Sequence, residues 1–91
     1  MSDGATGRAL ITGASSGLGA GFARLLSERG HEVILCGRDG ARLASVAGSL
    51  DGPSRVVVAD LTRPVELATV EALLADADAP VDLLVNNAAA G

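Results

Sequence analysis

Three glycines lie within the eight residues TGASSGLG, Thr12 to Gly19, directly after the apolar residues ALI. Glycine loses more conformational freedom on folding than any other residue, so this cluster needs a physical reason. Where a chain turns from a strand into a helix, unpaired backbone N–H groups and the positive end of the helix dipole attract phosphate. Gly13 would permit the sharp turn, Gly17 the close approach of a diphosphate, and Gly19 close packing of the helix on the sheet.

Two serines, Ser15 and Ser16, lie inside this glycine loop and could donate hydroxyl groups to a phosphate or a ribose. The alternative is an ordinary flexible turn, in which Gly and Ser are common. Dinucleotide binding is favoured because the loop follows a predicted strand and opens a predicted helix. A Walker-type phosphate loop is excluded, since the Gly-Lys-Ser/Thr ending is missing and the chain has no lysine.

Short apolar runs alternate with helical stretches along the whole chain, and they supply the elements that must position this loop. Asp39 is predicted to cap the second helix, Gly30 to end the first, and Pro64 to begin the third. The predicted strands are Arg8–Thr12, Glu32–Cys36, Arg55–Ala59 and Asp82–Asn86, and the predicted helices are Leu18–Arg29, Asp39–Leu50 and Pro64–Ala77.

Helical spacing predicts which side chains of each helix face the sheet. The predicted inward residues are Leu18, Phe22, Leu25 and Leu26 in the first helix, Leu43, Val46 and Leu50 in the second, and Leu67, Val70 and Leu74 in the third. Glu66, Glu71 and Asp76 are predicted to point outward from the third helix. The nearly continuous apolar strands indicate a parallel sheet covered on both faces.

The element order βαβαβαβ predicts an α/β fold with a doubly wound parallel sheet. Right-handed crossovers give the expected strand order 3-2-1-4, with the first two helices on one face and the third on the other. Ligands in such sheets bind beyond the carboxyl ends of the strands, where the strand order reverses. The reversal here falls between the first and fourth strands, beside the glycine loop.

The spacing Gly13-x-x-x-Gly17-x-Gly19 resembles the T-G-x-x-x-G-x-G signature of the short-chain dehydrogenase/reductase family. Three further stretches resemble the family in order: GRD at 37–39, DL at 60–61 and NNA at 86–88. The resemblance covers essentially the whole chain. It implies a Rossmann fold, of which residues 1–91 would be the incomplete N-terminal half, and NAD(P)-dependent interconversion of alcohols and carbonyls.

Arg38 is the residue from which a cofactor preference can be argued. It follows the second strand, where an acidic residue would favour NAD; an arginine can instead pair bidentately with the 2′-phosphate of NADP. NADP is therefore expected in preference to NAD, unless Asp39 turns toward the ribose. The resemblance implies that Asp60 accepts from the adenine amino group, although a turn or capping role is equally compatible with this residue. The predicted cofactor-binding residues are Gly13, Ser15, Ser16, Gly17, Leu18, Gly19, Arg38, Asp60, Leu61, Asn87 and Ala88.

Composition excludes several other functions. A net charge of −4 provides no basic face for nucleic acid or membrane, and no signal peptide or membrane span is apparent. The lone cysteine, Cys36, excludes an internal disulfide and supports no multi-cysteine metal site; it is expected to be a buried apolar residue. His31 is expected at the surface rather than in catalysis. The expected location is the cytoplasm.

No catalytic residue can be assigned, because the family's chemistry uses a Y-x-x-x-K motif and an upstream Ser, and this chain has neither Tyr nor Lys. The chain is therefore expected to be the cofactor-binding portion of a longer enzyme, with the substrate loop and the oligomer surfaces of a homo-oligomeric parent elsewhere. The alternatives are a stand-alone nucleotide-binding or regulatory module and a decayed gene product. The fourth strand is expected to form an exposed apolar edge.

Overall fold

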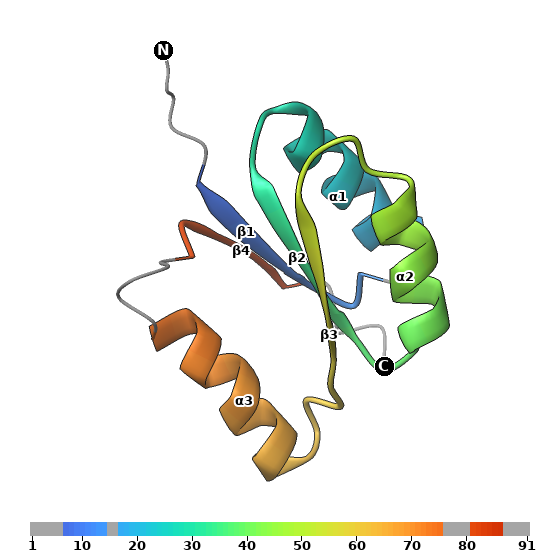
Figure 1. The fold of residues 1–91 in the computed structure, drawn as a ribbon. Coiled ribbons are helices and arrows are strands. Elements are labelled where there is room, and N and C mark those ends of the chain that lie inside the picture. Colours follow the sequence, from blue (N-terminus) through green and yellow to red (C-terminus); the bar gives the residue numbers. More distant parts are fainter. Residues whose placement is uncertain (1–6, 15–16, 76–80, 87–91) are drawn as a thin grey trace.

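A computed structural model of the 91-residue chain describes residues 7–14, 17–75 and 81–86, and these form a sheet flanked by helices (Figure 1). The elements alternate along the chain as the sequence predicts. They are β1 (Arg8–Thr12), α1 (Gly17–Glu28), β2 (Glu32–Gly37), α2 (Gly40–Gly48), β3 (Ser54–Val58), α3 (Pro64–Ala75) and β4 (Leu83–Asn86).

The described strands form one parallel sheet in the order β3-β2-β1-β4, which confirms the predicted topology. The predicted strand and helix ends lie within one or two residues of those observed, apart from the end of α3, where Asp76 and Ala77 lie outside the described residues. Leu83 and Leu84 in the edge strand β4 are 39% and 50% exposed, so the predicted apolar edge is confirmed.

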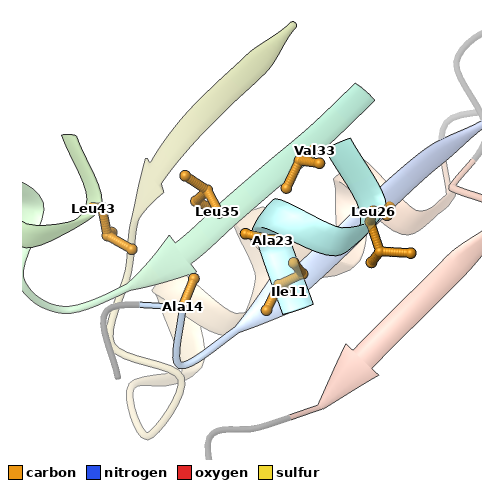
Figure 2. Close-up of a cluster of buried hydrophobic side chains, with 8 residues drawn as sticks. Ile11, Ala14, Ala23, Leu26, Val33, Leu35 and Leu43 are labelled. Atoms are coloured by element: carbon orange, nitrogen blue, oxygen red, sulfur yellow. The ribbon is translucent and has the colours of Figure 1, made fainter. Parts of the chain in front are cut away.

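The core lies on both faces of the central strands, because successive side chains of a strand point to opposite sides. On one face, residues of β1 and β2 meet α1 and α2 (Figure 2). On the other face, Leu10, Ile34 and Cys36 meet Ala59 and Val70, the latter from α3. The predicted division of the helices, two on one face and one on the other, is therefore confirmed.

The inward face of α1 differs from the one predicted, although Leu26 is buried as expected. Leu18 is 65% exposed, and Phe22 and Leu25 are 38% and 44% exposed. The residues that face the sheet are mostly small: Gly19, Ala20, Ala23, Leu26 and Ser27. The observed inward face is shifted by one residue from the predicted face, and one residue corresponds to a rotation of about 100° around the helix axis. Small residues allow α1 to pack close to β1 and β2, so close packing outweighed the larger apolar area of the predicted stripe.

The helix α3 also departs from expectation, because its apolar residues are spread around the helix. Of the predicted inward residues only Val70 is buried, whereas Leu67 and Leu74 are 37% and 39% exposed. Glu66 does not point away from the fold as predicted; its carboxylate accepts a hydrogen bond from the backbone N–H of Asp60 at 2.8 Å. The start of α3 is thus tied to the end of β3.

Helix ends follow the predicted local signals. Asp39 is the N-cap of α2 and accepts from the backbone N–H of Arg42 at 3.1 Å. Gly30, just after α1, adopts φ 93°, a left-handed conformation that favours glycine at a helix end. Pro64 occupies the first position of α3, where its missing N–H costs nothing.

Candidate nucleotide-binding site

The carboxyl ends of the parallel strands bring separate sequence motifs to one edge of the sheet. The register pairs Thr12 with Cys36 and Gly37 with Val58, so the turns after β1, β2 and β3 emerge side by side. Thr12 also pairs with Asn86 of β4, which places the reversal of strand order beside the glycine loop. Ligands of doubly wound sheets bind at this position.

The glycine loop leaves β1 through a turn that requires glycine. Gly13 adopts φ 65°, a region that L side chains rarely occupy. The next residue, Ala14, is buried and donates its N–H to the carbonyl of Cys36 at 3.2 Å, which fixes the loop against the end of β2. The predicted sharp turn at Gly13 is confirmed.

The first residue of α1, Gly17, faces open space. A Cβ built on it would meet no atom within 4 Å, so a ligand could approach the backbone where a side chain would otherwise stand. Leu18 beside it is exposed, and Gly19 is buried against the sheet. The geometry fits a phosphate group at the helix start, where N–H groups lack intrahelical partners. Ser15 and Ser16 lie outside the described residues.

The turn after β2 separates the roles of its two charged residues. The Asp39 carboxylate caps α2, and its Oδ2 lies 3.7 Å from the Arg42 Nε. Arg38 is exposed and lines a pocket of about 190 Å³ at the ends of β2 and β3. Arg38 therefore contributes to the pocket, whereas the carboxylate of Asp39 is occupied in holding the helix.

Asp60, after β3, shapes the next turn and lines the same pocket. Its Oδ1 accepts from the backbone N–H of Thr62 at 2.9 Å and from the Thr62 hydroxyl at 2.6 Å. The hydrogen bond from the Thr62 hydroxyl lowers the pKa of Asp60 most, and the bond from the Thr62 backbone lowers it further. The guanidinium groups of Arg38 and Arg63 add to this effect, so the pKa of Asp60 lies below its ordinary value. The predicted turn role of this residue is confirmed, and no described residue donates to its Oδ2.

Replacing Thr62 by Val is expected to raise the pKa of Asp60 toward its ordinary value, because the hydroxyl bond is lost while the backbone bond can persist. A depressed folded-state pKa stabilises the fold above the carboxyl's ordinary titration range, and that stabilisation is lost as the pH falls through the lower pKa. Carboxyl chemical shifts followed by NMR during a pH titration measure the change. Thr69→Val, on the exposed side of α3, is the control and should leave the Asp60 pKa unchanged. An unchanged pKa in Thr62→Val would contradict this account.

Two pocket residues, Arg63 and Glu66, were missed from the sequence. The sequence contains a signal for Glu66. An acidic residue three positions after the N-cap residue of a helix commonly accepts a hydrogen bond from the free N–H of that N-cap residue, and Glu66 lies three positions after Arg63. Here it reaches the N–H of Asp60 rather than that of Arg63. The remaining pocket residues are Arg38, Val58, Ala59 and Asp60.

The other sequence-predicted residues either do not line the pocket or lie outside the described residues. Leu61 lies in the turn after β3, half-buried against the face of the sheet that carries α3. Cys36 is buried, as expected, and burial raises the pKa of its thiol. His31 is half-buried rather than at the surface as expected, and it precedes β2 at the amino end of the sheet, away from the pocket. Asn87 and Ala88 lie outside the described residues.

The described residues contain neither a membrane-spanning helix nor a cluster of metal ligands. None of the helices there is long and apolar enough to cross a membrane. Within the same ranges, no three His, Cys, Asp or Glu side chains are grouped so as to hold a metal ion.

The family match and the similar proteins all indicate the same family. The short chain dehydrogenase family matches residues 7–91. An uncharacterized oxidoreductase of Staphylococcus epidermidis is 38% identical over 80 residues, which are 88% of this chain and 35% of that protein. A metagenomic short-chain oxidoreductase, solved in complex with NADP, superposes with a TM-score of 0.75 at 32% identity, covering 87% of this chain and 38% of that one.

A second solved structure, 3-ketoacyl-(acyl-carrier-protein) reductase from Brucella melitensis complexed with NADH, has a TM-score of 0.73 at 38% identity and covers 86% of this chain and 32% of that one. The chain thus spans about a third of the length of these relatives. The glycine turn, the strand order and the family match over residues 7–91 agree, and the chain belongs to the short-chain dehydrogenase family.

Proposed function

We propose that residues 1–91 are the N-terminal, dinucleotide-binding part of an NADP-dependent short-chain oxidoreductase acting on alcohols or carbonyls. The observation that supports this proposal is the different position of the two charged residues after β2. Asp39 is engaged as a helix cap, while Arg38 lines the adjacent pocket. The parent enzyme is proposed to be homo-oligomeric, as the resemblance implies, and cytoplasmic, as the composition of the chain leads us to expect.

The proposed diphosphate site is the glycine loop and the start of α1. Gly13 supplies the turn, and the open space beside Gly17 supplies room for phosphate oxygens. Ser15 and Ser16 would add hydroxyl donors, Leu18 would contribute a backbone N–H, and Gly19 would let the helix start pack close to the sheet. The dipole of the twelve-residue helix α1 favours the negative charge at this end.

The adenosine end is proposed to lie over the ends of β2 and β3. Arg38 would pair with the 2′-phosphate of NADP through parallel N–H bonds. The carboxylate of Asp60 has Oδ2 available among the described residues for the adenine amino group, and Leu61 would offer its backbone nearby. One relative was solved with NADP and another with NADH, so the preference of this chain is argued from its own residues.

The nicotinamide end is proposed to pass the residues after β4, among them Asn87 and Ala88. When bound, the dinucleotide would accept or donate a hydride. The chain's own residues would bind and orient it, because its 91 residues contain neither the Tyr nor the Lys that the family's acid–base chemistry uses. Activity therefore requires residues other than these.

Direct titration tests the proposal. The fluorescence of NADPH and of NADH should change saturably on addition of the chain, with NADPH binding tighter. The absence of Trp and Tyr keeps protein emission low in this experiment. Tighter binding of NADH would contradict the NADP assignment, and no saturable binding of either would contradict dinucleotide binding by the chain.

A further inference from the structure

The pocket beside Arg38 contains a second arginine to which the family motifs assign no role. Arg63 precedes α3 and lines the pocket together with Glu66, the apolar Val58 and Ala59, and Asp60. Arg38 reaches the pocket from the end of β2, whereas Arg63 reaches it from the start of α3. The pocket therefore has a cationic group at two separate places.

Arg63 is held by both its backbone and its side chain. Its N–H donates to the carbonyl of Asp60 at 3.0 Å, which closes a tight turn. Its Nε lies 3.8 Å from Oε2 of Glu66, whose Oε1 accepts from the N–H of Asp60 at 2.8 Å. Glu66 thus links Arg63 to the turn that carries the Asp60 carboxylate.

The ion pair itself contributes little to stability, because the Arg63 side chain is 73% exposed and the two atoms are far apart. Its effect is on orientation. The approach to Glu66 is at Nε, and the side chain is largely exposed, so the planar face and the terminal nitrogens of the guanidinium are accessible to a ligand. Among described residues, no hydrogen bond to those terminal nitrogens competes with such a ligand.

The chemistry around Arg63 suits a flat heteroaromatic base. Val58 and Ala59 offer apolar surface, Asp60 offers an acceptor for an exocyclic amino group, and a guanidinium plane stacks well on an aromatic ring. A phosphate would be less favoured on this side, because Asp60 and Glu66 both present carboxylates there.

We propose that Arg63, positioned by Glu66, stacks on the adenine base of the dinucleotide, while Arg38 alone reads the 2′-phosphate. This inference rests on the proposed function. Arg63 would then strengthen the binding of NADPH and NADH equally, and Glu66 would be a positioning residue that acts through Arg63.

The test compares Arg63→Ala with wild type by fluorescence titration of NADPH and NADH. The expected result is an equal weakening of both, by about 3- to 5-fold, as for a cation stacked at an exposed site. Arg42→Ala is the matched control, because Arg42 is equally exposed, at 72%, and has a comparable loose pair with Asp39. This control should bind both cofactors as wild type does.

The role of Glu66 is tested by Glu66→Gln, which keeps an oxygen acceptor for the N–H of Asp60 but removes the charge that holds Arg63. It should weaken both cofactors by less than Arg63→Ala does and leave the denaturation midpoint unchanged. In the double variant Arg63→Ala/Glu66→Gln the loss should equal that of Arg63→Ala, since Glu66 has nothing left to position.

Two results would overturn the inference while leaving dinucleotide binding intact. A loss confined to NADPH would mean that Arg63 pairs with the 2′-phosphate, and unchanged binding of both cofactors would mean that it does not touch the nucleotide. If the wild-type chain bound neither cofactor, the proposed function would fail as well, so the wild-type titration separates the two failures.

Discussion

Replacing Arg38 by Asp is expected to weaken NADPH binding by about 10- to 100-fold and to leave NADH binding nearly unchanged or slightly tighter. A hydrogen-bonded pair with a charged group contributes about 1.5–3 kcal/mol, which corresponds to this range. The carboxylate introduced would also repel the 2′-phosphate and could accept from a ribose hydroxyl. Competition between the two cofactors, followed by fluorescence, measures the change in their ratio.

The control for Arg38→Asp is Arg24→Glu, which changes the net charge equally at an exposed position of α1. It should shift the NADPH-to-NADH ratio only slightly, because exposed charges distant from the site are screened by salt. Equal effects of the two variants would show that overall charge, rather than a contact at the end of β2, sets the preference, and would contradict the role given to Arg38.

Replacing Leu26 by Ala is expected to lower the free energy of unfolding by about 2–3 kcal/mol. Leu26 is 8% exposed and packs with Ala23 and Ile11 in the cluster between α1 and the sheet (Figure 2). Removal of its side chain would leave a cavity that a close-packed core refills only in part. A domain of this size is stabilised by only about 5–14 kcal/mol, so the loss is large. Urea denaturation followed by circular dichroism measures it.

The neighbouring residue supplies a matched control for Leu26→Ala. Leu25 is 44% exposed, so Leu25→Ala removes the same atoms from a site that remains largely in water and should cost less than about 1 kcal/mol. The pair also tests the orientation of α1. The apolar spacing places both leucines on the inward face, whereas the structure buries only Leu26, so equal losses in the two variants would contradict the observed orientation.

Much of the fold could be predicted from sequence because its signals are local. The Asp39 cap, the glycine at position 30 and Pro64 each act through neighbouring backbone groups, and each lies where expected. The strand order followed from the handedness of crossovers, which constrains any such chain. The helix faces could not be fixed this way, because apolar spacing favours the largest side chains and α1 packs through its smallest.

The candidate site, too, contains residues that local sequence signals predict and residues that they do not. Gly13, Arg38 and Asp60 were recognised individually, because each follows a strand and has a distinctive side chain or none. The participation of Arg63 and Glu66 was not recognised, since Glu66 was expected to point to solvent. That expectation rested on helical spacing alone, which ignores the free N–H of Asp60 at the end of the neighbouring strand.

The sequence by itself determined the glycine turn, the alternation of strands and helices, and the presence of an arginine directly after β2. Only the tertiary structure decided that Arg38 lines the pocket with Asp60, and that Glu66 joins Arg63 to the Asp60 turn. The physical reason is range. Turns and caps depend on groups a few residues apart, whereas a pocket depends on which strand ends the parallel register brings together.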